Sequence, residues 1–160
     1  MSKVLDYKYS TEAIANFSQS ELARQEKNDC VVRAVAAASG SAYEPAHQFV
    51  KETFCRKNGK GTSGFHYTMN MMTKNGNKIN GKSVEKITEE HNTMLYYVVV
   101  KGVKKLRNTT TGSFIKKYPK GTYVVTVKGH AFTIKDGVVI GNVEDGKKMK
   151  KHIDGVWKIR

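Results

Sequence analysis

The stretch KNDCVVRAVAAASG (residues 27–40) decides most of the fold that this sequence predicts. Asn28 and Asp29 are favoured residues just before a helix, and Gly40 is typical of the position just after one. Between them, only Arg33 interrupts a run that is apolar on every side. Such a helix is normally buried, because any exposed face would place apolar surface in water. We therefore predict that this stretch forms a helix at the centre of the protein.

Cys30 stands at the N-terminal end of this predicted helix. The first backbone N–H groups of a helix have no partner within it, and together with the helix dipole they stabilise a thiolate. Cysteine is also among the most buried residue types, so a lone cysteine on an apolar helix is commonly part of the core. The position of Cys30 is therefore compatible with a nucleophile and with a structural role. The second cysteine, Cys55, has no such context and we expect it to be structural.

Apolar spacing and capping residues predict three further helices before Gly76. The first spans residues 11–26, where apolar residues form a loose stripe. The second begins at a capping box formed by Ser41 and Glu44, and the segment RKNGKGTSG ends it. The third includes Met69 and Met72 and stops at KNGN.

Beyond Gly76 the segments become short and rich in β-branched and aromatic residues, with glycine, asparagine and lysine between them. These segments predict strands of an antiparallel sheet: KSVEKI, MLYYVVV, GTYVVTVKG, HAFTIKDGVVIGN and GVWKI. The segment TTTGSFIKKYPKG predicts one or two helical turns. Because helices come first and strands last, we expect a single α+β domain over residues 1–160.

The segment HAFTIKDGVVIGN (residues 130–142) predicts a hairpin whose turn sets which side chains meet. We favour a type I turn through Asp136, followed by a bulge with Gly137 in the left-handed conformation. This register pairs Ile134 with Val138, Phe132 with Ile140, and His130 with Asn142. A strict two-residue Asp-Gly turn would instead pair Ile134 with Val139 and His130 with Val143, and would move Asn142 to the other face.

The favoured register supplies a chemical logic for Cys30. The imidazole of His130 could take the thiol proton and later donate it to a leaving group. The amide oxygen of Asn142 would accept from the imidazole and hold it in one orientation. The Cys30 N–H and the side-chain amide of Gln25 or Asn28 would bind the oxyanion of a tetrahedral intermediate.

These residues resemble the papain-like cysteine peptidase superfamily. The resemblance rests on the segments NDCVVRAVAAASG, YEPAHQFV and PKGTYVVTVKGHAFTIKDGVVIGN, and it is nearest to small bacterial and phage proteins with this fold. In chain order, the family places an oxyanion donor, a cysteine that opens a buried helix, a histidine on a later strand, and an asparagine or aspartate. Gln25 or Asn28, Cys30, His130 and Asn142 stand in that order. The resemblance implies N-terminal helices packed on a C-terminal antiparallel sheet.

The same resemblance implies a thiol-dependent hydrolase or acyl transferase that acts on an amide or isopeptide bond. The superfamily also contains deamidases, transglutaminases and inactive relatives, so the reaction type stays open. The expected substrate is a protein or peptide, and this chemistry needs no cofactor. We expect no metal site, because a pair such as Cys55 and His66 lacks the further ligands that zinc requires.

The charge distribution supports an alternative function. The chain has 28 basic and 14 acidic residues, and 15 of the basic residues but only 4 of the acidic ones fall in residues 101–160. An inactive papain-like protein could use this basic half to bind nucleic acid or an acidic protein. The sequence has no apolar run long enough for a membrane helix and too few cysteines for a disulfide framework. We therefore expect reduced cysteines, no membrane partner and a cytoplasmic location, in the host cytoplasm if the protein is viral.

Overall fold

The computed structural model describes residues 20–160, except 80, 87–94, 101–102, 109 and 142–151. Its helices are α2 (Glu21–Gln25), α3 (Cys30–Ser39), α4 (Tyr43–Thr53), α5 (Phe65–Asn75) and α7 (Thr111–Lys117). Its strands are β1 (Lys78–Ile79), β2 (Lys82–Lys86), β3 (Leu95–Val100), β4 (Val103–Asn108), β5 (Thr122–Val127), β6 (His130–Lys135), β7 (Val138–Ile140) and β8 (Ile153–Ile159). Six of the strands form one antiparallel sheet in the order β1-β2-β8-β5-β6-β7. The predicted α+β class is confirmed.

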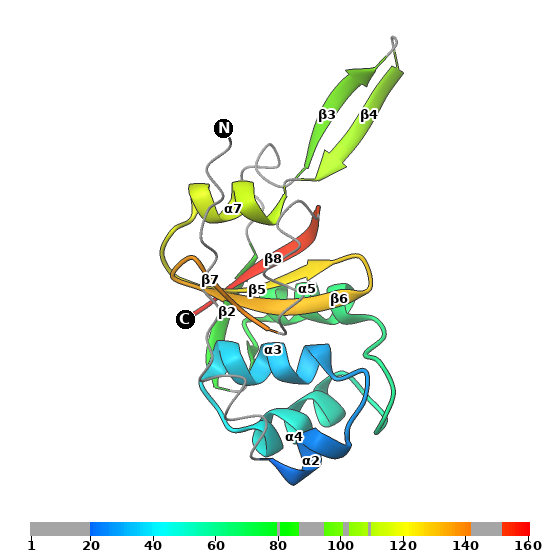
Figure 1. Ribbon diagram of the computed structural model, residues 1–160, viewed down its shortest axis with the longest axis vertical. Helices are drawn as coiled ribbons and strands as arrows, with labels where there is room; N and C mark the ends of the chain where they lie inside the picture. The colour runs from blue at the N-terminus through cyan, green and yellow to red at the C-terminus, as the bar shows by residue number, and fades with distance from the viewer. Residues whose placement is uncertain (1–19, 80, 87–94, 101–102, 109, 142–151) are drawn as a thin grey trace.

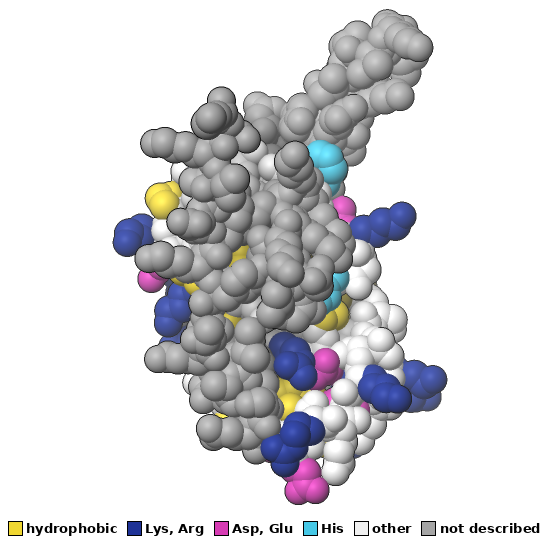
Figure 2. All heavy atoms as spheres, in the orientation of Figure 1, with side chains coloured by type: hydrophobic (Ala, Val, Ile, Leu, Met, Phe, Trp, Pro, Cys, Tyr) yellow, Lys and Arg dark blue, Asp and Glu magenta, His cyan; other side chains and the backbone are white. Residues whose placement is uncertain are grey.

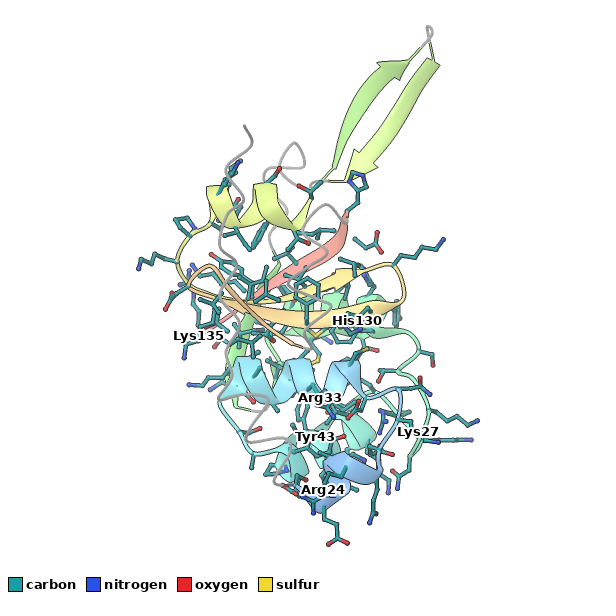
Figure 3. All side chains as sticks on the ribbon, viewed as in Figure 1. Arg24, Lys27, Arg33, Tyr43, His130 and Lys135 are labelled. Atoms are coloured by element: carbon teal, nitrogen blue, oxygen red, sulfur yellow. The ribbon has the colours of Figure 1, made fainter. Side chains whose placement is uncertain are left out.

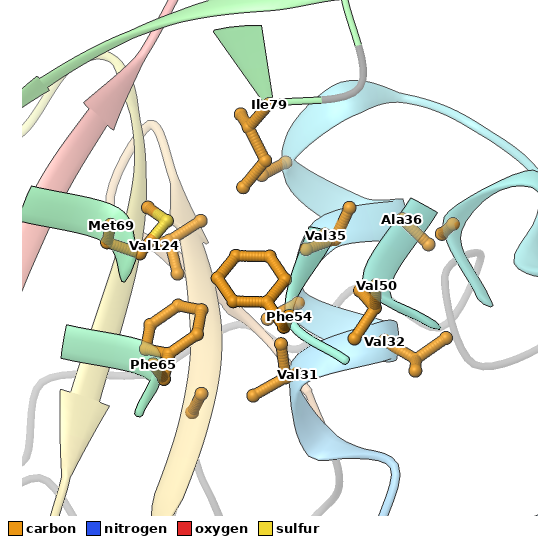
Figure 4. Packing of buried hydrophobic residues seen from close by; sticks show 14 of the residues in the cluster. Val31, Val32, Val35, Ala36, Val50, Phe54, Phe65, Met69, Ile79 and Val124 are labelled. Carbon is orange, nitrogen blue, oxygen red and sulfur yellow. The ribbon is translucent and has the colours of Figure 1, made fainter. Parts of the chain in front are cut away.

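The helix α3 lies in the core between the main sheet and α4, as its all-round apolar sequence predicts (Figure 1). Val32 and Val35 are fully buried, and burying each such side chain contributes roughly 1.5–3 kcal/mol. The hydroxyl of Thr133 in β6 donates to the Ala34 carbonyl at 2.7 Å, which joins the helix to the sheet. Gly40 ends the helix in the left-handed conformation, with φ at 70°. Figure 4 shows side chains from α3, α4, α5 and β5 meeting in this core.

A second apolar cluster covers the opposite face of the main sheet. It combines Phe114 of α7 with alternate residues of β5, β6 and β8: Tyr123, Val125, Val127, Phe132, Ile134, Ile153 and Val156. The short helix α7 was predicted from the segment TTTGSFIKKYPKG and is confirmed. The sheet is therefore buried on both faces, and each face packs against helices from a different part of the chain.

Two helix predictions are wrong in detail: the continuity of the first predicted helix through Ser20, and the capping box at the start of the second. The helix α2 begins at Glu21, because the Ser20 side chain caps it by accepting from the Ala23 N–H at 3.1 Å. The predicted helix over residues 11–26 is therefore not continuous, and its part over residues 11–19 lies outside the described residues. The predicted capping box of Ser41 and Glu44 does not form, since the Ser41 hydroxyl donates to the Ala42 carbonyl and the Glu44 carboxylate accepts from the Ser20 hydroxyl. The hydrogen bond from Ser20 to Glu44 therefore forms in place of the predicted capping box.

The strands do not form the single sheet that we predicted. β3 was expected from its sequence, but it pairs with β4 in a separate two-stranded sheet. Figure 1 shows this pair projecting away from the main sheet. Local composition identifies a strand, whereas its partner depends on contacts that are distant in sequence.

The favoured register of the β6–β7 hairpin is wrong, and the two-residue alternative is found. The pairs are Thr133 with Ile140, Ile134 with Val139, and Lys135 with Val138. Asp136 and Gly137 have φ of 48° and 78°, which is the pattern of a type I′ turn, whose twist matches that of the strands. The reason for this turn lies outside the hairpin: Gly121 donates its N–H to Asp136 Oδ1 at 2.9 Å and accepts from the Asp136 N–H at 2.8 Å.

We predict that replacing Asp136 with alanine destabilises the protein by about 1–3 kcal/mol, because the alanine side chain cannot accept from the Gly121 N–H and alanine is strained at positive φ. Asp136→Asn is the matched control, since asparagine tolerates this conformation and keeps an oxygen acceptor. Urea unfolding of the two variants measures the difference. Equal stability of the alanine and asparagine variants would contradict the role assigned to this turn.

Candidate active site

A cleft of about 1090 Å³ opens between the first turn of α3 and the start of β6. Cys30 and His130 both line it, together with Asn28 and Asp29 on one side and residues 61–66 on the other. Figure 3 shows His130 at the end of β6 that overlies α3. The cleft therefore contains a thiol and an imidazole from segments 100 residues apart in the sequence.

Cys30 is the first residue of α3, and its thiol faces the His130 side chain across the cleft closely enough for His130 to lower the thiol pKa. Burial raises the pKa of the thiol, but the interaction with His130 and the backbone N–H groups of Ala131 and Val31 lower it, and the net pKa is lowered. Each of these partners favours the charged form, because each places positive charge or an N–H donor at the sulfur. The structure thus brings together the two residues predicted as nucleophile and base.

The pairing of the strands explains why the thiol reaches β6. β7 pairs only with residues 133–135 of β6, so the described strand β7 does not extend alongside Ala131. The Ala131 N–H is then directed to the Cys30 sulfur. His130 is the first residue of β6, immediately after the turn at Lys128 and Gly129 that joins it to β5. The short partner strand and the tight turn therefore place both groups at one end of the sheet.

The side chain of Asp29 leaves the first turn of α3 uncapped. Its Oδ2 accepts from Arg33 Nε at 3.0 Å and from the Tyr43 hydroxyl at 2.7 Å, and it makes no capping bond. Burial and the bond to Asp29 raise the pKa of Tyr43, so this phenol remains a donor. Figure 3 shows Arg33 and Tyr43 close together beneath α3. The N–H groups at the start of α3 are therefore not occupied by Asp29.

The two predicted oxyanion donors have different positions. Asn28 lines the cleft, with φ at 53°, and its Nδ2 donates to the Gly59 carbonyl at 3.2 Å. Gln25 is exposed at the end of α2, where its Nε2 donates to Glu21 Oε1 at 3.3 Å, and it does not line the cleft. The prediction that Gln25 serves as a donor is therefore not supported, because α2 ends with this side chain directed back along the helix.

The predicted orienting residue, Asn142, lies outside the described residues. Val143, which the two-residue turn would pair with His130, lies outside them as well. Cys55 is exposed, with φ at 54°, and both cysteines are free thiols, as expected. Among the residues that the structure describes, no group of three or more His, Cys, Asp or Glu side chains could hold a metal. Within the same part of the chain, no helix combines the length and apolar character needed to cross a membrane.

Sequence reasoning missed His66 as a residue of the cleft. Its Nε2 lies 2.6 Å from Thr126 Oγ1, and its ring packs edge-on against Trp157 with 5.0 Å between ring centres. Gly155 makes room for both rings, since a Cβ there would lie 2.7 Å from His66 Cε1 and 2.6 Å from Trp157 Cη2. No motif marks His66, because its neighbours in the cleft come from β5 and β8.

No protein-family model, curated protein or solved structure gives a significant match to this chain. The functional argument therefore rests on the geometry and electrostatics of the cleft.

We predict that Gly155→Ala destabilises the protein by about 1–3 kcal/mol, since the added methyl group must displace the two packed rings. Gly61→Ala is the control, because nothing lies within 4 Å of a Cβ at this second cleft glycine. Chemical unfolding measures both. If Gly155→Ala is as stable as Gly61→Ala, the packing described for His66 and Trp157 is wrong.

Proposed function

We propose that this protein is a thiol-dependent hydrolase or acyl transferase with a papain-like arrangement, acting on an amide or isopeptide bond of a protein or peptide. The observation that carries the proposal is the Cys30 thiol at the start of a buried helix, in the same cleft as His130, which lowers the thiol pKa. The pKa of this thiol is lowered even though burial raises it. A core cysteine without activating neighbours would have a raised pKa instead.

In the proposed reaction, His130 accepts the proton of the Cys30 thiol and the sulfur attacks the substrate carbonyl carbon. The carbonyl oxygen becomes an oxyanion, which the Cys30 backbone N–H and the Asn28 amide stabilise. One such donor typically contributes about 10²–10³ in rate. The intermediate collapses as His130 protonates the departing amine, which leaves a thioester on Cys30.

Water completes hydrolysis, or an amine completes acyl transfer. His130 takes a proton from this second nucleophile as it attacks the thioester, and returns the proton to the departing Cys30 thiolate. The register found for residues 133–140 is not the one that pairs His130 with Asn142, so the proposal includes no orienting role for Asn142. A reducing compartment such as the cytoplasm suits the reaction, because the nucleophile must remain a free thiol.

Alkylation of Cys30 by iodoacetamide across a range of pH tests the proposal. Cys55→Ser is the background for every measurement, because Cys55 is an exposed free thiol. Since the folded pKa of Cys30 is lowered, its thiolate should persist below the pH at which a free thiol protonates, near 8.5, and be lost as the pH falls through the lowered value. We expect His130→Ala to slow alkylation at pH 6 about tenfold, because the thiol pKa rises toward its ordinary value.

The proposal is overturned if Cys30 reacts no faster than a free thiol and is indifferent to His130→Ala. Mass spectrometry of peptide amides incubated with the protein, with and without an added amine, then distinguishes hydrolysis from transfer. Release of free acid indicates hydrolysis, whereas amine adducts indicate transfer.

The position of the β3–β4 pair favours one alternative, a catalytically inactive protein that binds a polyanion. β4 contributes Lys104, Lys105 and Arg107 to a two-stranded projection whose strands contain no acidic residue. Elsewhere, on the face in Figure 2, the described Lys and Arg side chains are dispersed, with Asp and Glu among them. The basic half, residues 101–160, would therefore bind an acidic protein or nucleic acid through its β4 portion in this projection.

We predict that K104E/K105E/R107E abolishes binding to nucleic acid if that alternative holds. Binding of the unaltered protein should then weaken roughly 40-fold between 50 and 200 mM salt, as expected for about three phosphate contacts. Fluorescence anisotropy with a labelled duplex and a labelled single strand measures this. Alkylation of Cys30 serves as the control, because salt screens a buried contact far less. Binding that is unaffected by the triple substitution would exclude the projection as the binding element.

A further inference from the structure

A buried ionic cluster forms around Glu26, which lies four residues before Cys30 in the sequence. It consists of Glu26, His47 and Arg56, whose side chains are 6%, 7% and 0% exposed. One oxygen of Glu26 accepts from Arg56 and lies 3.0 Å from His47 Nε2, and the other accepts from the Gly59 N–H at 2.8 Å. Together these three side chains form the Glu26 cluster.

The Glu26 cluster ties two loops together. Arg56 also donates from Nη2 to the Lys27 carbonyl at 3.0 Å, and Asn28 donates to the Gly59 carbonyl. The first loop leads into Cys30, and the second leads to Gly61, where the opposite wall of the cleft begins. These hydrogen bonds therefore fix both the backbone that leads to Cys30 and the start of the cleft wall that faces Cys30.

Burial alone raises the pKa of Glu26, but Arg56, His47 and the Gly59 N–H lower it, and the net pKa is lowered. Glu26 is therefore ionised at neutral pH and pairs with a permanently charged guanidinium. A buried ion pair of this kind gives little net stability compared with apolar side chains of the same size. Its clearest consequence is geometric, since it fixes the backbone that it bonds.

We propose that Glu26 and Arg56 are positioning residues that hold the segment before Cys30 so that the thiol meets His130 and the N–H groups of α3. The inference rests on the function proposed above. Asn28, with φ at 53°, turns the chain between Glu26 and Cys30, and its side chain bonds the Gly59 carbonyl of the second loop. Without the Glu26 cluster, the two loops separate and the start of α3 moves relative to β6.

Arg56→Lys tests the inference without altering any charge. Lysine can pair with Glu26 but cannot reproduce the planar fork that also reaches the Lys27 carbonyl. Because the net charge near Cys30 is the same, a change in the thiol pKa reports geometry. We expect the pKa from iodoacetamide alkylation in the Cys55→Ser background to rise by about one unit, and alkylation at pH 6 to slow about tenfold.

Glu26→Gln gives a second test, in which the sign of the shift separates two explanations. Removing a negative charge lowers the pKa of a nearby thiol by electrostatics alone, whereas loss of positioning raises it. We expect a rise. The matched control is Glu52→Gln, which removes the same charge from an exposed position on α4 and should produce no rise.

The outcomes distinguish the two proposals. A wild-type Cys30 that titrates as a free thiol overturns the proposed function. An activated wild-type Cys30 together with unshifted or lowered pKa values in Arg56→Lys and Glu26→Gln overturns the positioning role alone. Where either variant does not unfold cooperatively, His47→Ala replaces it, because alanine removes one contact to Glu26 and leaves the contact between Glu26 and Arg56. It should then raise the thiol pKa by a smaller amount, and no rise counts against the inference.

Discussion

The contact between the first turn of α3 and the first residues of β6 is the constraint on which the cleft depends. α3 is apolar on nearly every side, so it must lie between the sheet and α4, and the Thr133–Ala34 hydrogen bond joins it to β6. Once the helix lies along the strand, its N-terminal end meets His130. The nucleophile is therefore placed by the burial of a helix, and the cost of exposing that helix to water maintains the arrangement.

The ionisation of Cys30 is a balance between opposing effects. Burial favours the neutral thiol, while His130 and two backbone N–H groups favour the thiolate and outweigh it. Donors fixed in the backbone are effective here because they are already oriented and need no rearrangement when charge develops. Asp29 contributes by directing its carboxylate to Arg33 and Tyr43 and leaving the first turn of α3 uncapped. A site of this kind depends on the start of α3 being held in place. The Glu26 cluster bonds the segment just before that start.

The glycines and turns near the cleft show how neighbouring segments determine local conformation. Asp136 adopts a positive φ because Gly121 bonds both its backbone and its side chain. Gly155 has no side chain because two aromatic rings occupy the space where one would lie. The conformation of Asp136 thus depends on Gly121, 15 residues away, and the absence of a side chain at Gly155 depends in part on His66, 89 residues away.

The sequence by itself determined the elements whose signals are local: the buried helix that starts at Cys30 and ends at Gly40, the helices α4, α5 and α7, and the strands of an α+β fold. It also led to the prediction that His130 would meet Cys30, because a thiol at a helix N-terminus needs a neighbouring imidazole to act as a nucleophile. Only the tertiary structure decided the hairpin register and the separate pairing of β3 with β4. It also decided that Gln25 does not line the cleft and that Glu26, His47 and Arg56 form a buried cluster. The physical reason is that hydrophobic periodicity and capping act over a few residues. Strand partners and buried ion pairs are instead selected by the free energy of the whole packed chain.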